Sequence, residues 1–356
     1  MKRLGDIATY INGYAFKPSD WTDVGLPIIR IQDLTGNSYQ ANRYNGEYAP
    51  KYEVNKGDVL ISWSASLGVY VWQGEKALLN QHIFKVVFDK AEISKSFFVH
   101  QVENILEKAA SEAHGATMKH LTKPVFDALP FYLPPLEEQR KIAAVLDKVC
   151  DLVAKRRQQL TKLDELIKAR FVEMFGDPKT NPYKWDMRRL DEICENLDNR
   201  RVPITSTDRK AGIYPYYGAS GIVDYVEDYI FDEDILLISE DGANLVMRTT
   251  PIAFSVSGKV WVNNHAHVVR FTSKATQKYI EVCFELTDIS SSITGTAQPK
   301  LNQAKLNAMI FCMPPLELQE LFTTFVEQTE KMKTAISSSL DKLETLKKAL
   351  IQKYFE

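Results

Sequence analysis

Two histidines, His265 and His267, have the type and spacing that could begin a metal site. They alternate along a predicted strand, so both imidazoles face the same side of it. A metal site needs further ligands, and the sequence indicates none beside this pair. We therefore interpret the two histidines as a packed or hydrogen-bonded pair.

Sequence fingerprints of catalysis and of cofactor binding are missing as well. No Gly-x-Gly occurs, which argues against the usual glycine-rich loops for dinucleotides and S-adenosylmethionine, and there is no P-loop. No His-Glu-x-x-His and no cluster of Cys and His suggests zinc. Asn181-Pro182-Tyr183 resembles part of the adenine methyltransferase motif, but it lacks the second proline and lies in a predicted linker. None of these fingerprints therefore indicates a catalytic centre or a cofactor site.

Composition is that of an ordinary globular protein. The 356 residues suggest two or three domains, with 45% hydrophobic and 25% charged residues. The 44 Lys plus Arg and 46 Asp plus Glu give a net charge of −2, which leaves room only for a local basic surface. We expect no membrane span, because no apolar run approaches the ~20 residues required, and no signal peptide. Four separated cysteines fit reduced thiols in the cytoplasm.

The chain is a tandem repeat. FYLPPLEEQ at 131–139 recurs as FCMPPLELQ at 311–319, and this offset of 180 continues without a gap to residues 175 and 355. Farther upstream the offset drifts, as insertions in loops would cause. The upstream matches are 80–82 with 263–265, at an offset of 183, and 3–7 with 189–193, at an offset of 186.

Each repeat ends in a predicted long helix. Pro134-Pro135 and Pro314-Pro315 lie at the helix starts, where a missing N–H costs nothing. Apolar residues then recur with 4-3 spacing over about five heptads. The two seams would be buried best against each other, as an antiparallel coiled coil. Lys333 and Lys347 interrupt the second seam, and such polar positions often specify register and partner.

The part of each repeat before the helix is predicted to be mixed. The expected strands are 27–31, 58–62, 83–88, 234–239, 253–257 and 267–271, and the expected helices are 95–110 and 276–286. The predicted fold class is α/β (α+β), with two mixed α/β domains separated by the two long helices in a pseudo-twofold repeat. The predicted parts are 1–133 for the first domain, 134–175 for its helix, 176–184 for a linker, 185–313 for the second domain and 314–356 for the C-terminal helix.

Several segments resemble the specificity (S) subunits of type I restriction–modification systems. The resemblance covers the whole chain in the expected order, and it includes the duplication and the long helices. The matching segments are 61–68, 115–121, 134–139, 216–221, 239–244, 295–302 and 314–319.

The resemblance implies a non-catalytic DNA reader without a cofactor. Each domain would be a target recognition domain for one half of a split site in double-stranded DNA, and the coiled coil would set the spacer. Two modification subunits would bind the frame and methylate adenine, and restriction subunits would join the full complex. A pseudo-twofold protein on one face of DNA would place its two target recognition domains one turn of the double helix apart, ~34 Å.

Residue types then indicate which side chains could contact DNA, since Arg, Lys, Ser and aromatic residues suit groove edges and phosphates. Each set also has an equally good explanation without DNA. Trp63 could pack in the core, residues 200–210 could form a solvated loop, and Lys119 and Lys300 could cap the helices. The candidates in the first domain are Tyr14, Lys17, Trp63, Ser64 and Ser66, with Lys119 before the first long helix. The candidates in the second are Arg200, Arg201, Arg209, Lys210, Tyr216, Tyr217, Ser220 and Asn244, with Lys300 before the second long helix.

Other classes of function remain open on the sequence alone. A stand-alone methyltransferase would bind S-adenosylmethionine as an isolated chain. A coiled-coil scaffold or a lectin-like protein would not capture DNA together with a modification subunit. The specificity half of another multi-subunit methyltransferase would read DNA in the same way.

Overall fold

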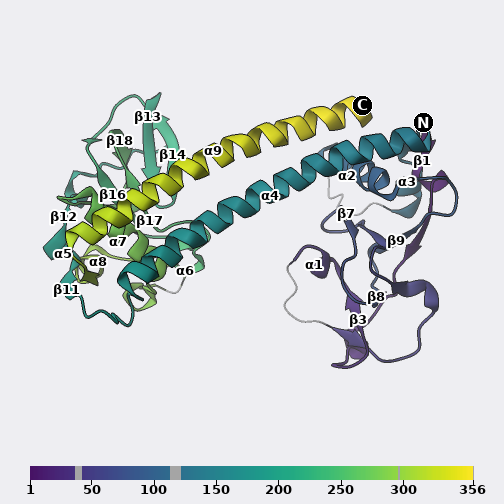
Figure 1. The fold of residues 1–356 in the computed structure, drawn as a ribbon, viewed down its shortest axis with the longest axis horizontal. Helices are drawn as coiled ribbons and strands as arrows, with labels where there is room; N and C mark the ends of the chain where they lie inside the picture. The colour runs from purple at the N-terminus through teal and green to yellow at the C-terminus, as the bar shows by residue number, and fades with distance from the viewer. Residues whose placement is uncertain (37–41, 113–121, 296, 356) are drawn as a thin grey trace. The chain divides into compact units, whose positions relative to one another are not determined.

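The computed structural model comprises two units, and each takes in part of both long helices (Figure 1). The structure describes residues 1–36, 42–112, 122–295 and 297–355. Unit 1 consists of Met1–Arg156 together with Ser339–Glu356, and unit 2 consists of Arg157–Ser338. Among the described residues, no helix combines the length and the apolar character that a membrane crossing requires.

Unit 1 contains two four-stranded sheets. The first is antiparallel, in the order β2 (Thr9–Asn12), β9 (Ile83–Val87), β6 (Val59–Ser62), β7 (Gly68–Val71). The second has the order β4 (Arg43–Tyr44), β3 (Leu26–Ile29), β8 (Ala77–Leu79), β5 (Glu53–Val54), with β3 and β8 parallel. The remaining elements are β1 (Lys2–Arg3) paired with β10 (Pro130–Phe131), η1 (Leu4–Asp6), η2 (Pro18–Asp20), α1 (Ile31–Leu34), η3 (Pro50–Tyr52), α2 (Lys95–Glu112) and α3 (Lys123–Ala128).

Unit 2 repeats this arrangement strand for strand. Its antiparallel sheet has the order β12 (Glu195–Asn196), β19 (Ala266–Arg270), β16 (Ile235–Ser239), β17 (Ala253–Val256). Its second sheet has the order β14 (Gly221–Val226), β13 (Ala211–Gly218), β18 (Lys259–Val262), β15 (Phe231–Asp232), with β13 and β18 parallel. The remaining elements are β11 (Asp186–Arg189) paired with β20 (Ile310–Met313), α5 (Leu190–Ile193), η4 (Asp198–Arg200), α6 (Asn244–Met247), α7 (Lys274–Leu286), η5 (Ser290–Ser292) and α8 (Gln303–Asn307).

The predicted duplication is therefore confirmed, and the strand registers extend it. Ser62 at the end of β6 pairs with Ile83, just as Ser239 at the end of β16 pairs with Ala266. Each predicted strand and helix of the two domains appears in the structure within a few residues.

One inner strand of each antiparallel sheet, β6 in unit 1 and β16 in unit 2, is apolar on both faces, because both faces are covered. In β16, Leu236 and Ile238 belong to the core that contains α7 and the long helices. Ile235 and Leu237 belong to the core shared with the second sheet. Successive side chains of the strand point to opposite faces and so enter two different hydrophobic cores. This explains why the sequence shows a continuous apolar run there.

The long helices are α4 (Leu136–Phe175) and α9 (Leu316–Phe355), each of 40 residues, as the heptad pattern predicts. The repeated Pro-Pro-Leu-Glu-x-Gln motif stabilises both helix starts. The Nε2 of Gln139 donates to the carbonyl of Pro134 at 2.8 Å, and that of Gln319 donates to the carbonyl of Pro314 at 2.7 Å. Both glutamines are buried, so a hydrogen bond shielded from water fixes the first turn of each long helix against the two prolines before it.

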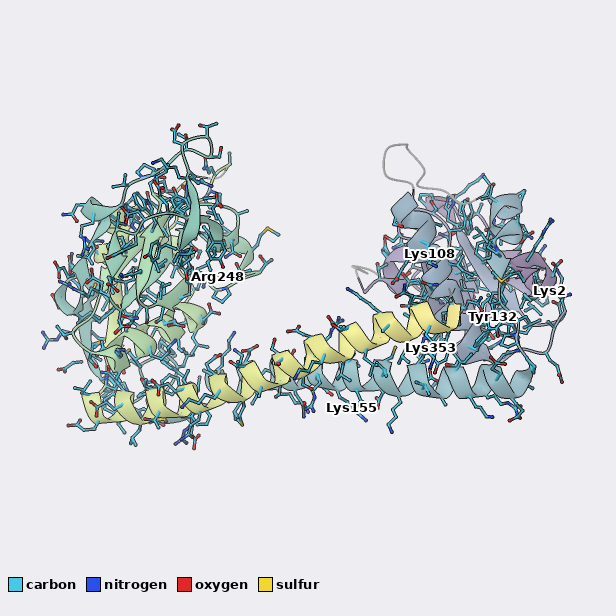
Figure 2. The ribbon with its side chains drawn as sticks, turned by 90° about the horizontal axis from the view of Figure 1, so that it is seen from above. Lys2, Lys108, Tyr132, Lys155, Arg248 and Lys353 are labelled. Carbon is cyan, nitrogen blue, oxygen red and sulfur yellow. The ribbon has the colours of Figure 1, made fainter. Side chains whose placement is uncertain are left out.

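Each unit is completed by the end of the helix that belongs to the other repeat. In unit 2, Phe171 of α4 is fully buried and stacks on Tyr279 of α7, with ring centroids 5.2 Å apart. It also meets Phe322 of α9 edge-on at 5.5 Å. In unit 1, Phe355 of α9 packs edge-on against Phe97 at 5.5 Å. Figure 2 marks these last turns of α9 in unit 1 with Lys353.

Candidate nucleic-acid interface

Four loop segments of unit 2 converge at one edge of its antiparallel sheet. Ser239 and Ala266 pair at this edge, so the chain leaves β16 where it enters β19. The backbone N–H of Glu240 donates to the carbonyl of His265 at 2.9 Å. The N–H of Leu301 donates to Glu240, and the hydroxyl of Ser239 donates to Ala219. The segments 216–221, 239–244 and 295–302 precede the second long helix and carry the family resemblance in the second repeat. These hydrogen bonds bring the three segments together.

A charged network holds these loops from beneath. Arg201 donates through Nη1 to the Oε2 of Glu240 at 2.6 Å and to the carbonyl of Ala266 at 2.8 Å. Lys300 adds an ion pair to the other oxygen of Glu240 at 3.1 Å. Burial acts to raise the pKa of Glu240, but the hydrogen bonds from Arg201 and Lys300 help to hold this pKa below its ordinary value. Glu240 is therefore ionised and anchors the edge.

His267 belongs to the same network and is almost fully buried. Its Nδ1 lies 2.6 Å from Asp198, and its Nε2 lies 2.7 Å from the carbonyl of Leu301. Burial acts to raise the pKa of Asp198, but its hydrogen bond with His267 is among the contacts that lower it below its usual value. Both histidines are hydrogen-bonded, but they do not form the predicted pair on one strand face, because His265 precedes β19 and bonds to Asp241 instead. Within the described ranges, no group of three His, Cys, Asp or Glu could hold a metal.

The exposed tips of this edge are polar. His265 and Lys300 are each half exposed, and Ser220 is exposed in the turn between β13 and β14. These groups can donate or accept hydrogen bonds at a groove edge. We call this set of loops, 217–221, 239–244, 263–266 and 297–301, the unit 2 edge.

The equivalent edge of unit 1 gathers four of the predicted residues. The backbone N–H of Trp63 donates to His82 at 3.2 Å, the counterpart of the Glu240 to His265 bond. Trp63 also donates through Nε1 to Asn12 at 3.2 Å and stacks on Phe84. We call the segments 12–14 and 63–67, together with His82, the unit 1 edge. Four predicted residues lie in these segments: Tyr14, Trp63, Ser64 and Ser66.

Exposure differs among those four side chains. Tyr14 is 45% exposed and Ser66 is exposed, so both can meet a ligand. Ser64 is buried, and its carbonyl accepts from Ser62 and from the N–H of Ser66 at 2.7 Å. Trp63 is partly buried, so packing and contact share its surface. Ser64 thus shapes the loop, and its side chain is too buried for the direct contact that the sequence predicted.

Other predicted residues of unit 2 lie away from the edge. Arg200 pairs with Glu233 at 2.6 Å, near the opposite ends of the strands, and its guanidinium covers the ring of Phe231. Arg209 pairs with Asp224 at 3.3 Å and Lys210 with Glu227 at 2.8 Å, on the hairpin of β13 and β14. Lys17, in unit 1, is exposed beside η2. The sequence grouped Arg200, Arg201, Arg209 and Lys210 in one surface, and the structure does not.

Three predicted contacts of unit 2 are corrected by burial or by existing bonds. Tyr216 is 1% exposed and its hydroxyl bonds to Ile204, so its side chain is a core group. Arg201 lies in the buried network. The side chain of Asn244 accepts from the N–H of Thr250 and donates to its carbonyl, both at 3.0 Å, and so closes a loop. Tyr217 is half-buried beside Phe254. Lys119 lies outside the described residues.

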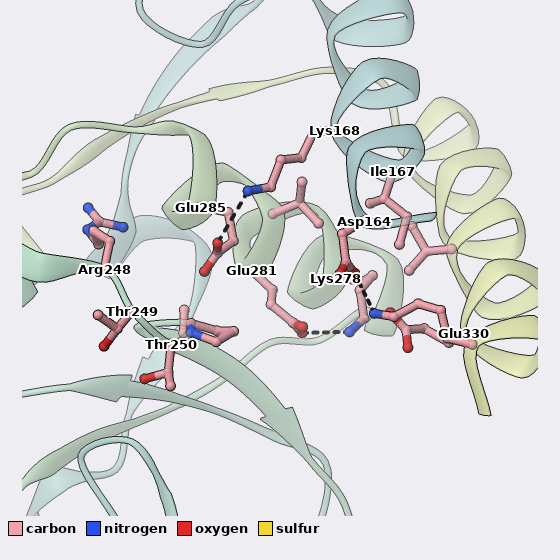
Figure 3. A pocket seen from close by; sticks show the side chains of 15 residues that line it. Asp164, Ile167, Lys168, Arg248, Thr249, Thr250, Lys278, Glu281, Glu285 and Glu330 are labelled. Carbon is pink, nitrogen blue, oxygen red and sulfur yellow. Dashed lines mark hydrogen bonds and ion pairs between the residues drawn. The ribbon is translucent and has the colours of Figure 1, made fainter. Parts of the chain in front are cut away.

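A hollow of about 400 Å³ in unit 2 is a different kind of surface (Figure 3). Its charges face one another, as in Lys278 with Glu281 at 2.7 Å and Lys168 with Glu285 at 3.8 Å. Arg248 donates there to the carbonyls of Phe284 and Thr287 at the end of α7. Its charges are balanced and paired, so this hollow has no net attraction for phosphates.

Sequence reasoning missed the role of His265 in this edge. The imidazole of His265 bonds to Asp241, 24 positions earlier in the chain, at 2.9 and 3.0 Å. The alignment of 80–82 with 263–265 already placed a histidine at the same position in both repeats. That repetition was the available signal.

Comparison with known proteins gives matches over both repeats. The family model described as type I restriction modification DNA specificity domain matches residues 1–163 and 182–348. The type I restriction enzyme EcoBI specificity subunit of Escherichia coli is 30% identical over 168 residues, which is 46% of this chain and 35% of that protein. The MjaVIII specificity subunit of Methanocaldococcus jannaschii is 22% identical over 388 residues, 98% of this chain and 90% of that protein.

The matches differ in how much of each relative they cover. The chain spans about a third of the EcoBI subunit, and likewise 34% of a putative specificity subunit from Haemophilus influenzae that is 35% identical over 134 residues. The solved S subunit of a type I restriction-modification system from M. genitalium has a TM-score of 0.62 and 14% identity, over 100% of this chain and 95% of that one. At this identity the likeness shows the fold.

Proposed function

The chain belongs to the family of type I restriction modification DNA specificity domains, and from that membership we propose that it is the specificity subunit of a type I restriction–modification complex. In this proposal each unit reads one half of a bipartite site in double-stranded DNA. The chain supplies recognition, and the partners supply methylation and cleavage. We also propose that it acts in the cytoplasm, where such DNA is found.

The observation that carries this proposal is one scaffold with two different edges. Both units have the same sheets in the same order, and a histidine carbonyl accepts the same loop hydrogen bond in each. The exposed groups differ, with Tyr14 and Ser66 in unit 1 and His265, Lys300 and Ser220 in unit 2. Two units with the same fold but different exposed side chains suit a DNA site whose two halves differ in sequence.

The long helices support two copies of one partner. Among the described residues, eight large apolar side chains are exposed on them, and the offset of 180 relates four of these in pairs: Leu152 with Met332, and Leu166 with Leu346. Unit 1 holds Leu152 and Leu346, and unit 2 holds Leu166 and Met332. We propose that the two exposed residues within each unit dock one modification subunit, an adenine methyltransferase that brings its own S-adenosylmethionine. Restriction subunits would join the complex through the modification subunits. Exposed apolar groups that recur by symmetry are typical of partner contacts.

The spacer between the half-sites would be set by the two helices. Each has 40 residues, and the border between the units falls after Arg156 in α4 and after Ser338 in α9. These borders differ by 182 residues, so they lie at nearly equivalent places in the repeat.

Exchange of one reader tests the proposal. Residues 185–313 would be replaced by the equivalent region of a relative, and the chimera co-expressed with modification subunits. Methylome sequencing should then show one new half-site and one unchanged half-site. The matched control exchanges residues 1–133, which should change the other half. Methylation without a bipartite motif in the wild type, or changes in both halves from one exchange, would contradict the proposal. Binding of S-adenosylmethionine by the isolated chain would instead support a stand-alone methyltransferase.

A further inference from the structure

We propose that His265 reads a base edge and that Asp241 orients it, so that this pair determines one base pair of the half-site bound by unit 2. The inference rests on the proposed DNA-reading function and adds a specificity-determining residue to it. His265 lies in the turn between β18 and β19, on the unit 2 edge.

The backbone of this turn is held from three directions. Asn263 is 6% exposed, and its Oδ1 accepts from the N–H of His265 at 2.8 Å. The N–H of Asn263 donates to the carbonyl of Tyr217 at 3.0 Å, which ties the turn to β13. The carbonyl of His265 accepts from Glu240 at 2.9 Å. Little freedom is left except in the torsions of the imidazole, so the side chain starts from a preorganised base.

Asp241 then fixes the imidazole. Its two carboxylate oxygens lie 2.9 and 3.0 Å from Nδ1 of His265. An ionised carboxylate only accepts hydrogen bonds, so Nδ1 carries a proton and Nε2 is the free end of the ring. The Asp241 side chain is 17% exposed and the His265 side chain is 50% exposed, so the carboxylate supports from below and the imidazole faces outward.

The free Nε2 suits a base edge. In a neutral ring it accepts a hydrogen bond, as from the exocyclic amine of adenine or cytosine, and in a protonated ring it donates, as to guanine. Either way it makes one directional bond, whose position Asp241 sets. A phosphate contact would need only positive charge, for which a half-exposed lysine such as Lys300 suffices.

The first repeat offers an internal comparison. His82 occupies the equivalent turn, and its carbonyl accepts from Trp63 as that of His265 accepts from Glu240. The register of β6 and β16 puts Ser64 where unit 2 has Asp241. The imidazole of His82 instead meets the edge of the Trp63 ring at 5.0 Å. The histidine position recurs, while the residue two places after the strand end is Ser64 in unit 1 and the carboxylate Asp241 in unit 2.

The experiment uses the chain assembled with its modification subunits. His265→Ala, His265→Gln, Asp241→Ala and Asp241→Asn are compared with the wild type on duplexes that carry each base at every position of the site. Lys274→Ala is the matched control, since this exposed lysine pairs with Asp234 at the start of α7. Folding is checked by thermal melting, and methylome sequencing reads the same preferences in cells.

His265→Ala should lower discrimination at one position of one half-site by roughly 5- to 100-fold and leave all others unchanged. Asp241→Ala should affect that same position more weakly, while Asp241→Asn, whose Oδ1 still accepts from Nδ1, should retain most of the preference. His265→Gln should alter the base preferred there. Lys274→Ala should keep the wild-type motif.

Two outcomes separate the inference from the proposed function. Equal loss of affinity at every position, with all preferences kept in His265→Ala and Asp241→Ala, would overturn the role of His265 while leaving the specificity subunit intact. If the wild-type complex shows no bipartite preference, the proposed function itself fails. Should His265→Ala not fold, His265→Gln and Asp241→Ala still decide, because both keep the buried network unchanged.

Discussion

Nζ of Lys333 in α9 lies 2.7 Å from Oδ1 of Asp164 in α4, so an ion pair joins the two long helices inside unit 2. Lys333 interrupts the apolar seam of α9, and it also meets Glu330 at 2.9 Å. Burial acts to lower the pKa of Lys333, but the bonds to Asp164 and Glu330 outweigh it and raise this pKa. The seam lysine thus has a partner on the opposite helix, as a register-setting residue should.

The first prediction concerns this pair. In a double-mutant cycle with Lys333→Met and Asp164→Asn, we expect a coupling of about 0.5–1 kcal/mol, since Asp164 is half exposed and the pair is partly screened. Because the folded pKa of Lys333 is raised, its contribution is complete below the unfolded lysine value of ~10.4 and is lost as pH rises through the folded value. Urea unfolding at pH 8 and at pH 11 measures both effects. The exposed Lys331, substituted by Met, is the control and should show no coupling to Asp164.

The second prediction concerns the exchanged helix ends. Phe171→Ala should destabilise by about 3–5 kcal/mol, because the ring is fully buried among Phe175, Tyr279 and Phe322. Loss of hydrogen-exchange protection should appear in α7 of unit 2, although Phe171 belongs to the first repeat. Val172→Ala, at an exposed neighbour, should change stability by less than about 0.5 kcal/mol. Opening of unit 1 in place of unit 2 would contradict this assignment.

The third prediction concerns the spacer. Insertion of four residues after Arg157 in α4 and after Ser338 in α9 adds ~6 Å to both helices, at 1.5 Å per residue. At ~3.4 Å per base pair, the methylated motif should gain about two base pairs between unchanged half-sites. The single insertion in α4 is the comparison, and α9 should resist it and limit the gain to about one base pair with weaker binding. An unchanged spacer in the double insertion would show that the helices do not set it.

The fourth prediction concerns the partners. Leu152→Glu with Leu346→Glu places two charges on the apolar patch of unit 1, where a docked subunit would have to desolvate them. Native mass measurement should show the complex reduced from two modification subunits to one. Gln158→Glu, on an exposed polar position of α4, should leave two bound. Retention of both subunits by the double variant would place the docking surface elsewhere.

Much of the fold could be predicted because its signals are local. The heptad spacing and the double prolines predicted both long helices, and the offset of 180 predicted the duplication. The exchange of helix ends could not be predicted, since Phe171 and Phe355 look alike as seam residues whichever unit receives them. Only the packing of α7 and α2 decides their destination.

The candidate interface was predicted less completely. Residue types marked Tyr216 and Arg201 as contacts, because type alone does not reveal whether a side chain faces the core. The pair of His265 and Asp241 is 24 residues apart, and only the register of β16 against β19 brings it together. Tyr14 and Ser66 were predicted, and the structure places both at the exposed unit 1 edge.

The exchanged helix ends also impose an order on synthesis. A chain emerges from the ribosome at roughly 5–20 residues per second, and domains usually close in that order. Here unit 2, Arg157–Ser338, has all its parts first, whereas unit 1 waits for Leu350, Ile351 and Phe355, which pack on its core. The unit that is begun first is therefore finished last. A chain shortened to end before Leu350 would therefore contain every part of unit 2 but would lack the last turns of α9, which pack on the core of unit 1.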